Sequence, residues 1–137
     1  MKYEHLIIEK TEYKKLKNYL ENAHYSNDPV FKRAIGTFLN ELKTARVVAA
    51  SEIPEDVVRF NSKVTIRTPF IDSKTYQLVA PEESNLKIDK ISILSPMALA
   101  LFGYAVNDSI EWQFPNGTNN IQIIEVTHDR PVITNTL

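Results

Sequence analysis

The segment of residues 91–126 constrains the fold most, because it places a strand, a short helix and a hairpin in one order. Its first three residues alternate between apolar and polar, which is the period of a half-buried strand. Ser95 followed by Pro96 predicts a helix start, since proline suits the first helical turn. Residues 97–102 are apolar nearly all round, and Gly103 can end their helix in the left-handed conformation. The segment therefore predicts a small helix that packs against a sheet.

Two amphipathic helices are predicted before residue 50. Thr11 is expected to cap the first helix, and Asp28 before Pro29 is expected to cap the second. The apolar residues of the first helix fall at helical spacing: Tyr13, Leu16, Leu20 and Ala23. Those of the second helix form one broad stripe: Phe31, Ala34, Ile35, Phe38, Leu42 and Ala45. Turn-forming residues separate the helices, so the sequence predicts a short antiparallel helical hairpin.

After residue 50 the hydrophobic period changes from that of helices to that of strands. Alternation predicts antiparallel strands around residues 64–66 and 76–78, joined by a turn near residues 70–73. A second hairpin follows residue 108, and its first strand carries three apolar residues expected in the core: Ile110, Trp112 and Phe114. The turn at residues 115–117 leads into a final strand over residues 121–126, because Asn-Gly tolerates positive φ.

This order of elements predicts an α+β fold. Residues 1–50 form the N-terminal helical hairpin, and residues 51–137 form an antiparallel β-domain with one short helix. Residues 127–137 are expected to be a loose tail.

Composition excludes several kinds of chemistry. The chain has 137 residues, of which 43% are hydrophobic and 24% charged, and its net charge of −1 gives no reason to expect sequence-specific nucleic-acid binding. The absence of cysteine excludes disulfides, thiolate nucleophiles and zinc–thiolate sites. No signal-peptide pattern is present, and no apolar run approaches the roughly 20 residues that span a bilayer. We therefore expect a cytoplasmic protein without a membrane partner.

The sequence also offers no catalytic or metal-binding motif. His5, His24 and His128 are far apart, and none belongs to a helical i,i+4 pair. The three glycines are isolated, so they cannot form a phosphate-binding loop. Ser95 is explained better as a helix cap than as a nucleophile. We predict no enzyme activity, no cofactor and no metal site.

Residues 91–126 resemble the C-terminal domain of the Gre transcript-cleavage factors, and most closely the short Gre-like proteins called Rnk, regulators of nucleoside diphosphate kinase. The matching residues are dispersed: Ser95, Pro96, Met97, Ala100, Leu101, Gly103, Val106, Asp108, Pro115 and Gly117. A run over residues 53–64 fits the same relatives, so the resemblance covers residues 10–128. It implies an FKBP-like sheet, preceded by a coiled-coil hairpin of the kind that enters the secondary channel of bacterial RNA polymerase.

The resemblance directs attention to the tip of the hairpin, where Gre factors present two acidic residues that help to hold a catalytic magnesium ion. Glu21 matches one of these acids, but the other falls on the neutral Asn18. Asp28 is the only other nearby acid, and helix capping accounts for it. The predicted helices are also too short to reach as far as a full Gre hairpin. The sequence therefore favours a regulator that does not stimulate transcript cleavage.

The second candidate surface is the turn Ser95-Pro96-Met97. In Gre proteins the corresponding turn grips the rim-helix coiled coil at the mouth of the secondary channel, although an acid that precedes it in some relatives is Leu94 here. The turn either docks on the polymerase or only caps and packs the short helix. An exposed Met97 would favour docking and a buried one packing.

The leading hypothesis is thus a noncatalytic protein that binds RNA polymerase and competes with Gre factors. Three alternatives remain open: a Gre factor that retains cleavage stimulation, an interaction module for another protein, and an FKBP-like prolyl isomerase or chaperone. The isomerase would need an aromatic pocket, for which the candidates are Tyr76, Phe102, Tyr104, Trp112 and Phe114.

Overall fold

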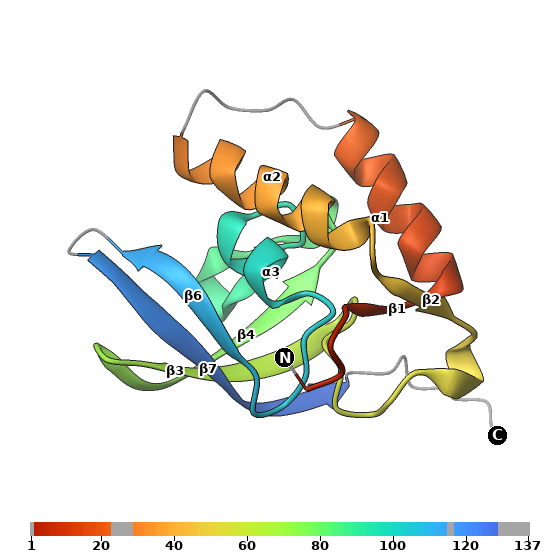
Figure 1. Cartoon of the computed structure of the whole chain (residues 1–137). Helices are drawn as coiled ribbons and strands as arrows, with labels where there is room; N and C mark the ends of the chain where they lie inside the picture. The colour runs from red at the N-terminus through yellow and green to blue at the C-terminus, as the bar shows by residue number, and fades with distance from the viewer. Residues whose placement is uncertain (1, 23–28, 115–116, 129–137) are drawn as a thin grey trace, which may run out of the picture.

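The computed structural model describes residues 2–22, 29–114 and 117–128. Its helices are α1 (Lys10–Asn22), α2 (Pro29–Leu42) and α3 (Pro96–Leu101), and its 3-10 turns are η1 (Ala50–Glu52), η2 (Pro81–Glu83) and η3 (Leu86–Ile88). Its strands are β1 (Ile7–Glu9), β2 (Arg46–Val48), β3 (Ser62–Thr68), β4 (Ile71–Val79), β5 (Lys90–Ser92), β6 (Ser109–Phe114) and β7 (Gly117–His128). The mixture of a curled sheet with helices on one side confirms the predicted α+β class (Figure 1).

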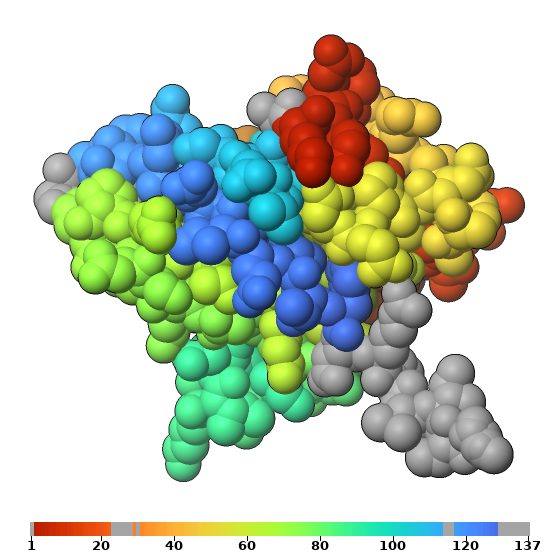
Figure 2. All heavy atoms as spheres, turned by 90° about the horizontal axis from the view of Figure 1, so that it is seen from below, coloured from red at the N-terminus to blue at the C-terminus, as the bar shows by residue number. Residues whose placement is uncertain are grey.

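The large sheet has the strand order β5-β4-β3-β7-β6. The pairs β3–β4, β3–β7 and β6–β7 are antiparallel, as predicted. The expectation of an entirely antiparallel sheet is wrong for β5, which pairs parallel with β4 and places Leu78 opposite Ile91. The chain leaves β4, passes through η2 and η3, and returns to run beside β4 in the same direction. This connection projects from the body (Figure 2), and Leu86 and Ile88 on it are 78% and 58% exposed.

A second, two-stranded sheet was not predicted. β1 pairs parallel with β2, so that Ile8 lies opposite Val47. The N–H of Arg46 donates to the carbonyl of Leu6 at 2.8 Å, and the N–H of Ile7 donates to the carbonyl of Gly103 at 3.4 Å. The small sheet therefore holds the start and the end of the helical region together.

The two predicted helices are present, but the first is capped differently. Thr11 lies inside α1, and the carboxylate of Glu9 accepts the backbone N–H groups of Thr11 at 2.9 Å and Glu12 at 3.0 Å. An anion at this position satisfies free donors and complements the positive end of the helix dipole. Residues 23–28, and with them the predicted cap Asp28, lie outside the described residues. The antiparallel hairpin therefore stays a prediction.

One hydrophobic core contains residues from both sides of residue 50. Leu16 and Leu20 of α1 and Ile35, Phe38 and Leu42 of α2 are buried in the same cluster as the inner face of the large sheet. α2 packs against α3, while α1 packs against β1 and β2. Both long helices lie on the same side of the large sheet (Figure 1). The helical segment and the β-segment are thus packed together.

The C-terminal hairpin matches the prediction in its strands but not in its end. β7 is longer than expected, because Thr127 and His128 continue the strand instead of starting a loose tail. The Nε2–H of His128 donates to the carbonyl of Glu55 at 2.7 Å, and the Oγ of Ser62 lies 3.0 Å from Nδ1. These contacts hold the end of β7 against the segment before β3. Residues 129–137 lie outside the described part of the chain.

Gly103 supplies a test of the fold. Its φ is +84°, and a Cβ on it would lie 3.1 Å from the Cβ of Leu6. We expect Gly103→Ala to lower the free energy of unfolding by about 1–3 kcal/mol, because it combines a strained φ with a close contact. Urea denaturation followed by circular dichroism measures this change.

Gly36 in α2 is the matched control. A Cβ added there meets nothing within 4 Å, and its φ is not in the left-handed region. Gly36→Ala should raise the free energy of unfolding by up to about 1 kcal/mol, because alanine is the better helix former. Equal effects of the two substitutions would contradict the packing described at Gly103.

Candidate functional site

The turn before α3 is fixed by several short-range hydrogen bonds. The Oγ of Ser95 accepts the N–H of Ala98 at 3.3 Å, which confirms Ser95 as the helix cap. The Oγ of Ser92 accepts the N–H of Leu94 at 3.0 Å, and the carbonyl of Ser92 accepts the N–H of Ser95 at 2.9 Å. Pro96 fixes its own φ at the first helical position. The turn is therefore rigid before any partner binds.

The side chains of this turn are neither fully buried nor fully exposed. Leu94, Ser95, Pro96 and Met97 all retain part of their surface. Leu94 and Met97 also pack against the edge of the hydrophobic core. Met97 thus combines packing with an accessible face, so its exposure leaves the docking and packing interpretations both open.

The structure describes one side of the predicted hairpin tip. Glu21 is exposed in the last turn of α1, and Asp28 lies outside the described residues. At the other predicted tip position, the carbonyl and the side-chain oxygen of Asn18 accept the side-chain amide of Asn22 at 2.9 and 3.1 Å. Within the described ranges, no group of three or more His, Asp or Glu residues could hold a metal ion.

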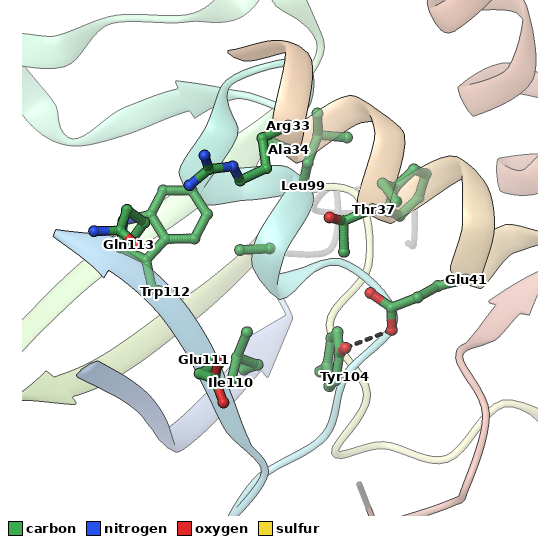
Figure 3. Close-up of a pocket in the computed structure, with 12 residues that line it drawn as sticks. Arg33, Ala34, Thr37, Glu41, Leu99, Tyr104, Ile110, Glu111, Trp112 and Gln113 are labelled. Atoms are coloured by element: carbon green, nitrogen blue, oxygen red, sulfur yellow. Dashed lines mark hydrogen bonds between the residues drawn. The ribbon is translucent and has the colours of Figure 1, made fainter. Parts of the chain in front are cut away.

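A groove between α2, α3 and β6 was not predicted from the sequence. Its volume is about 260 Å³. Its lining comes from all three elements and from the loop after α3: Arg33, Ala34, Thr37, Phe38, Glu41, Leu99, Ala100, Tyr104, Ile110, Glu111, Trp112 and Gln113. Figure 3 shows α2 along one side and β6 along the other. Ala34 on α2 and Ala100 on α3 leave room here because their side chains are single methyl groups.

The two ends of the groove differ in charge. Arg33 lies at the same end as Trp112 and Gln113, while Glu41 and Tyr104 lie at the other end (Figure 3). The hydroxyl of Tyr104 donates to Oε2 of Glu41 and connects α2 to the loop after α3. Burial, together with the neighbouring Glu41 carboxylate, raises the pKa of Tyr104 above its ordinary value. Tyr104 therefore remains a neutral hydrogen-bond donor over the whole physiological range.

Polar contacts also connect α1 to the β-segment. The guanidinium of Arg59 donates to Glu12 through Nη2 at 2.9 Å and through Nε at 3.3 Å. The hydroxyl of Tyr19 donates to Oε1 of Glu82 at 2.7 Å. A bidentate contact such as that between Arg59 and Glu12 fixes the relative orientation of the two side chains as well as their distance.

The aromatic residues proposed for a prolyl-isomerase pocket do not come together as a set. Tyr104 and Trp112 line the groove, but Phe102 is buried in the core. Tyr76 lies on β4 and is absent from the groove lining, and the side chain of Phe114 lies outside the described part. Trp112 packs against the hydrophobic core, as predicted, but it is only half-buried, because it also lines the groove.

The chain is similar to transcription elongation factors in sequence and in structure. Residues 53–128 match the family described as transcription elongation factor, GreA/GreB, C-term. The GreA of Pelobacter propionicus is 32% identical over 114 residues, which cover 80% of this chain and 72% of that protein. The GreA of Magnetococcus marinus is 37% identical over 87 residues, 63% of this chain, so the match spans only 55% of that relative's length.

A solved structure shares most of the fold. The GreA/GreB elongation factor from Nitrosomonas europaea aligns with a TM-score of 0.72 at 33% identity, over 90% of this chain and 98% of that one. The alignment therefore extends beyond the matched β-segment into the helical segment. In the described part of this chain, no helix is both long and apolar enough to cross a bilayer.

The hydrogen bond between Tyr104 and Glu41 gives a pH-dependent prediction. Tyr104→Phe should lower the free energy of unfolding at pH 8 by about 1–2 kcal/mol, because a partly buried carboxylate loses its donor. The pKa of Tyr104 is raised in the folded state. Its contribution to the free energy of unfolding is therefore complete below the unfolded-state pKa of about 10, and it is lost progressively as the pH rises above that value.

Urea denaturation at pH 8 to 11 should therefore show that the difference in the free energy of unfolding between wild type and Tyr104→Phe becomes smaller as the pH approaches 11. Tyr76→Phe is the control for the loss of a tyrosine hydroxyl outside the groove. A constant difference for Tyr104→Phe across this range would contradict the assignment.

Proposed function

Because the chain belongs to the GreA/GreB family of transcription elongation factors, we propose that it is a noncatalytic regulator that binds bacterial RNA polymerase near the secondary channel and competes with Gre factors. The observation that carries the proposal is the family match over residues 53–128, which includes the preorganised turn before α3. In this proposal the protein is cytoplasmic, as its polymerase partner is, and it acts through a protein-binding surface.

The contact surface in this proposal is Ser95-Pro96-Met97, docked on the rim-helix coiled coil as in Gre proteins. Two features of the turn support it. The hydrogen bonds of Ser92 and Ser95 fix the backbone, so little conformational entropy is lost on binding. Met97 offers a flexible apolar side chain that keeps part of its surface accessible while its base packs on the core.

The proposed lack of cleavage activity is supported by the length of the helices and by the residues near the predicted tip. α1 has 13 residues and α2 has 14, so each rises only about 20 Å. Their buried faces are used against the sheet, which limits how far they can extend from it. Glu21 is a single exposed acid whose predicted partner position is the neutral Asn18, a weaker magnesium ligand than a carboxylate. These features fit a Rnk-like protein with an FKBP-like sheet and a short hairpin.

Polymerase binding is the first test of the proposal. The purified chain should be retained on immobilised bacterial RNA polymerase, and added GreA should displace it. Met97→Glu should weaken binding at least tenfold, since it places a charge in an apolar contact, and its circular dichroism spectrum should show that the variant still folds. Glu21→Gln is the control and should bind like the wild type. A chain that neither binds polymerase nor competes with GreA would refute the proposal.

Transcript cleavage is a separate test. Stalled elongation complexes incubated with the chain and magnesium should release no more short 3′ RNA than complexes without it, because the second tip acid is missing. Added GreA should give the cleavage products as the positive control, and excess chain should suppress them. If the chain itself stimulates cleavage, the noncatalytic assignment is wrong, and Glu21→Gln would then show whether the tip is responsible.

A further inference from the structure

The groove between α2, α3 and β6 runs along the edge of the large sheet. β6 is the last strand in the order β5-β4-β3-β7-β6, and its pairing with β7 accounts for one side of its backbone. Four consecutive residues of β6, positions 110–113, line the groove. Consecutive side chains of a strand point to opposite faces, so a lining that includes all four residues fits a groove beside the strand's edge. The backbone of β6 therefore borders the groove along its open side.

The interior of the groove is apolar and is made by small residues. Ala34 and Phe38 of α2 and Leu99 and Ala100 of α3 contribute apolar side chains to its lining, and the two alanines leave space because their side chains are short. Trp112 forms part of the wall and is half-buried, so its ring already has a packed side and an accessible side. Partly buried tryptophans next to a cavity are typical anchors for a bound side chain.

Charge distinguishes the two ends of the groove. Arg33 is exposed at the Trp112 end. Glu41, held by Tyr104, lies at the opposite end, and Glu111 is exposed on β6. An acidic group is therefore favoured beside Arg33 and disfavoured beside Glu41, which gives a ligand lying along β6 one preferred direction.

We propose that this edge groove binds an extended peptide segment of a partner protein, which adds to β6 as a further strand. An apolar side chain of the peptide enters the space between Ala34 and Ala100, and an acidic side chain two positions along lies beside Arg33. Strand addition accounts for both the strand edge beside the groove and the apolar and charged side chains that line it. Main-chain hydrogen bonds to the edge supply affinity, and alternate side chains of the peptide supply specificity. A small molecule would use the apolar space but not the strand edge.

The groove is separate from the proposed polymerase contact. None of Ser95, Pro96 and Met97 is among its lining residues. Peptide binding and polymerase binding can therefore be tested independently, and either can fail without the other.

Trp112 is the only tryptophan in the chain, so its fluorescence reports directly on the groove. A library of random nine-residue peptides displayed on phage would be selected on the full chain, and the most enriched peptide would be synthesised and titrated. We expect an apolar residue and an acid at positions i and i+2 in the enriched set, micromolar binding, and a blue shift of the Trp112 emission.

Three changes should weaken the binding of the synthetic peptide. Ala100→Phe fills the groove and should reduce affinity at least tenfold, and Arg33→Glu should reduce it about fivefold. N-methylation of every second peptide amide should abolish binding in one register and preserve it in the other, because the amides of a strand point alternately to its two edges. Met97→Glu is the control and should leave peptide binding unchanged.

If the circular dichroism spectrum shows that Ala100→Phe does not fold, Ala34→Leu fills the same space from α2 and replaces it. The proposal is overturned if no peptide is enriched, if the groove-filling variant binds the peptide as the wild type does, or if both N-methylated registers bind equally. A blue shift of the Trp112 emission produced by the non-fluorescent cyclohexanol but by no peptide would also overturn it, because it would mark a small-molecule site.

Discussion

The ring of Phe102 is the contact on which the arrangement of helices and sheet depends. It meets Phe38 of α2 edge-on at a centroid distance of 6.4 Å and Phe60 of the segment before β3 at 5.4 Å. Burial of a phenylalanine side chain contributes about 1.5–3 kcal/mol, and each aromatic pair adds about 0.5–1.5 kcal/mol. Phe102 also ends α3, so a single residue holds α2, α3 and the entry to the sheet in one place. The position of α2, and hence the groove beside it, follows from this cluster.

The features predicted correctly from the sequence are those with local causes. The cap at Ser95 and the start of α3 at Pro96 are determined by neighbouring residues, and the alternation in β3 and β6 reflects one buried face on each strand. The family resemblance rests on the same local patterns, which is why the order of residues alone is enough to relate residues 53–128 to the Gre proteins.

The features missed depend on residues that are distant along the chain. β1 and β2 have three residues each, and both helices lie between them in the sequence. No periodic pattern in the sequence therefore predicts that they pair. Glu9 takes the place of Thr11 as the helix cap because the small sheet brings the Glu9 carboxylate to the first free N–H groups. The groove is lined by Ala34 and Ala100 from different helices, and alanine in a helix carries no signal of a cavity. Trp112 fits the alternation of β6 and packs against the core, but it is only half-buried because it lines the groove.

The β1–β2 pair also determines where the two ends of the helical region lie. Because Arg46 hydrogen-bonds to Leu6, the start and the end of the helical region lie side by side, while the buried faces of α1 and α2 pack on the same core as the large sheet. The residues between β1 and β2 therefore form one continuous segment that contributes no strand to the large sheet, and the turn at Ser95 follows a strand of that sheet.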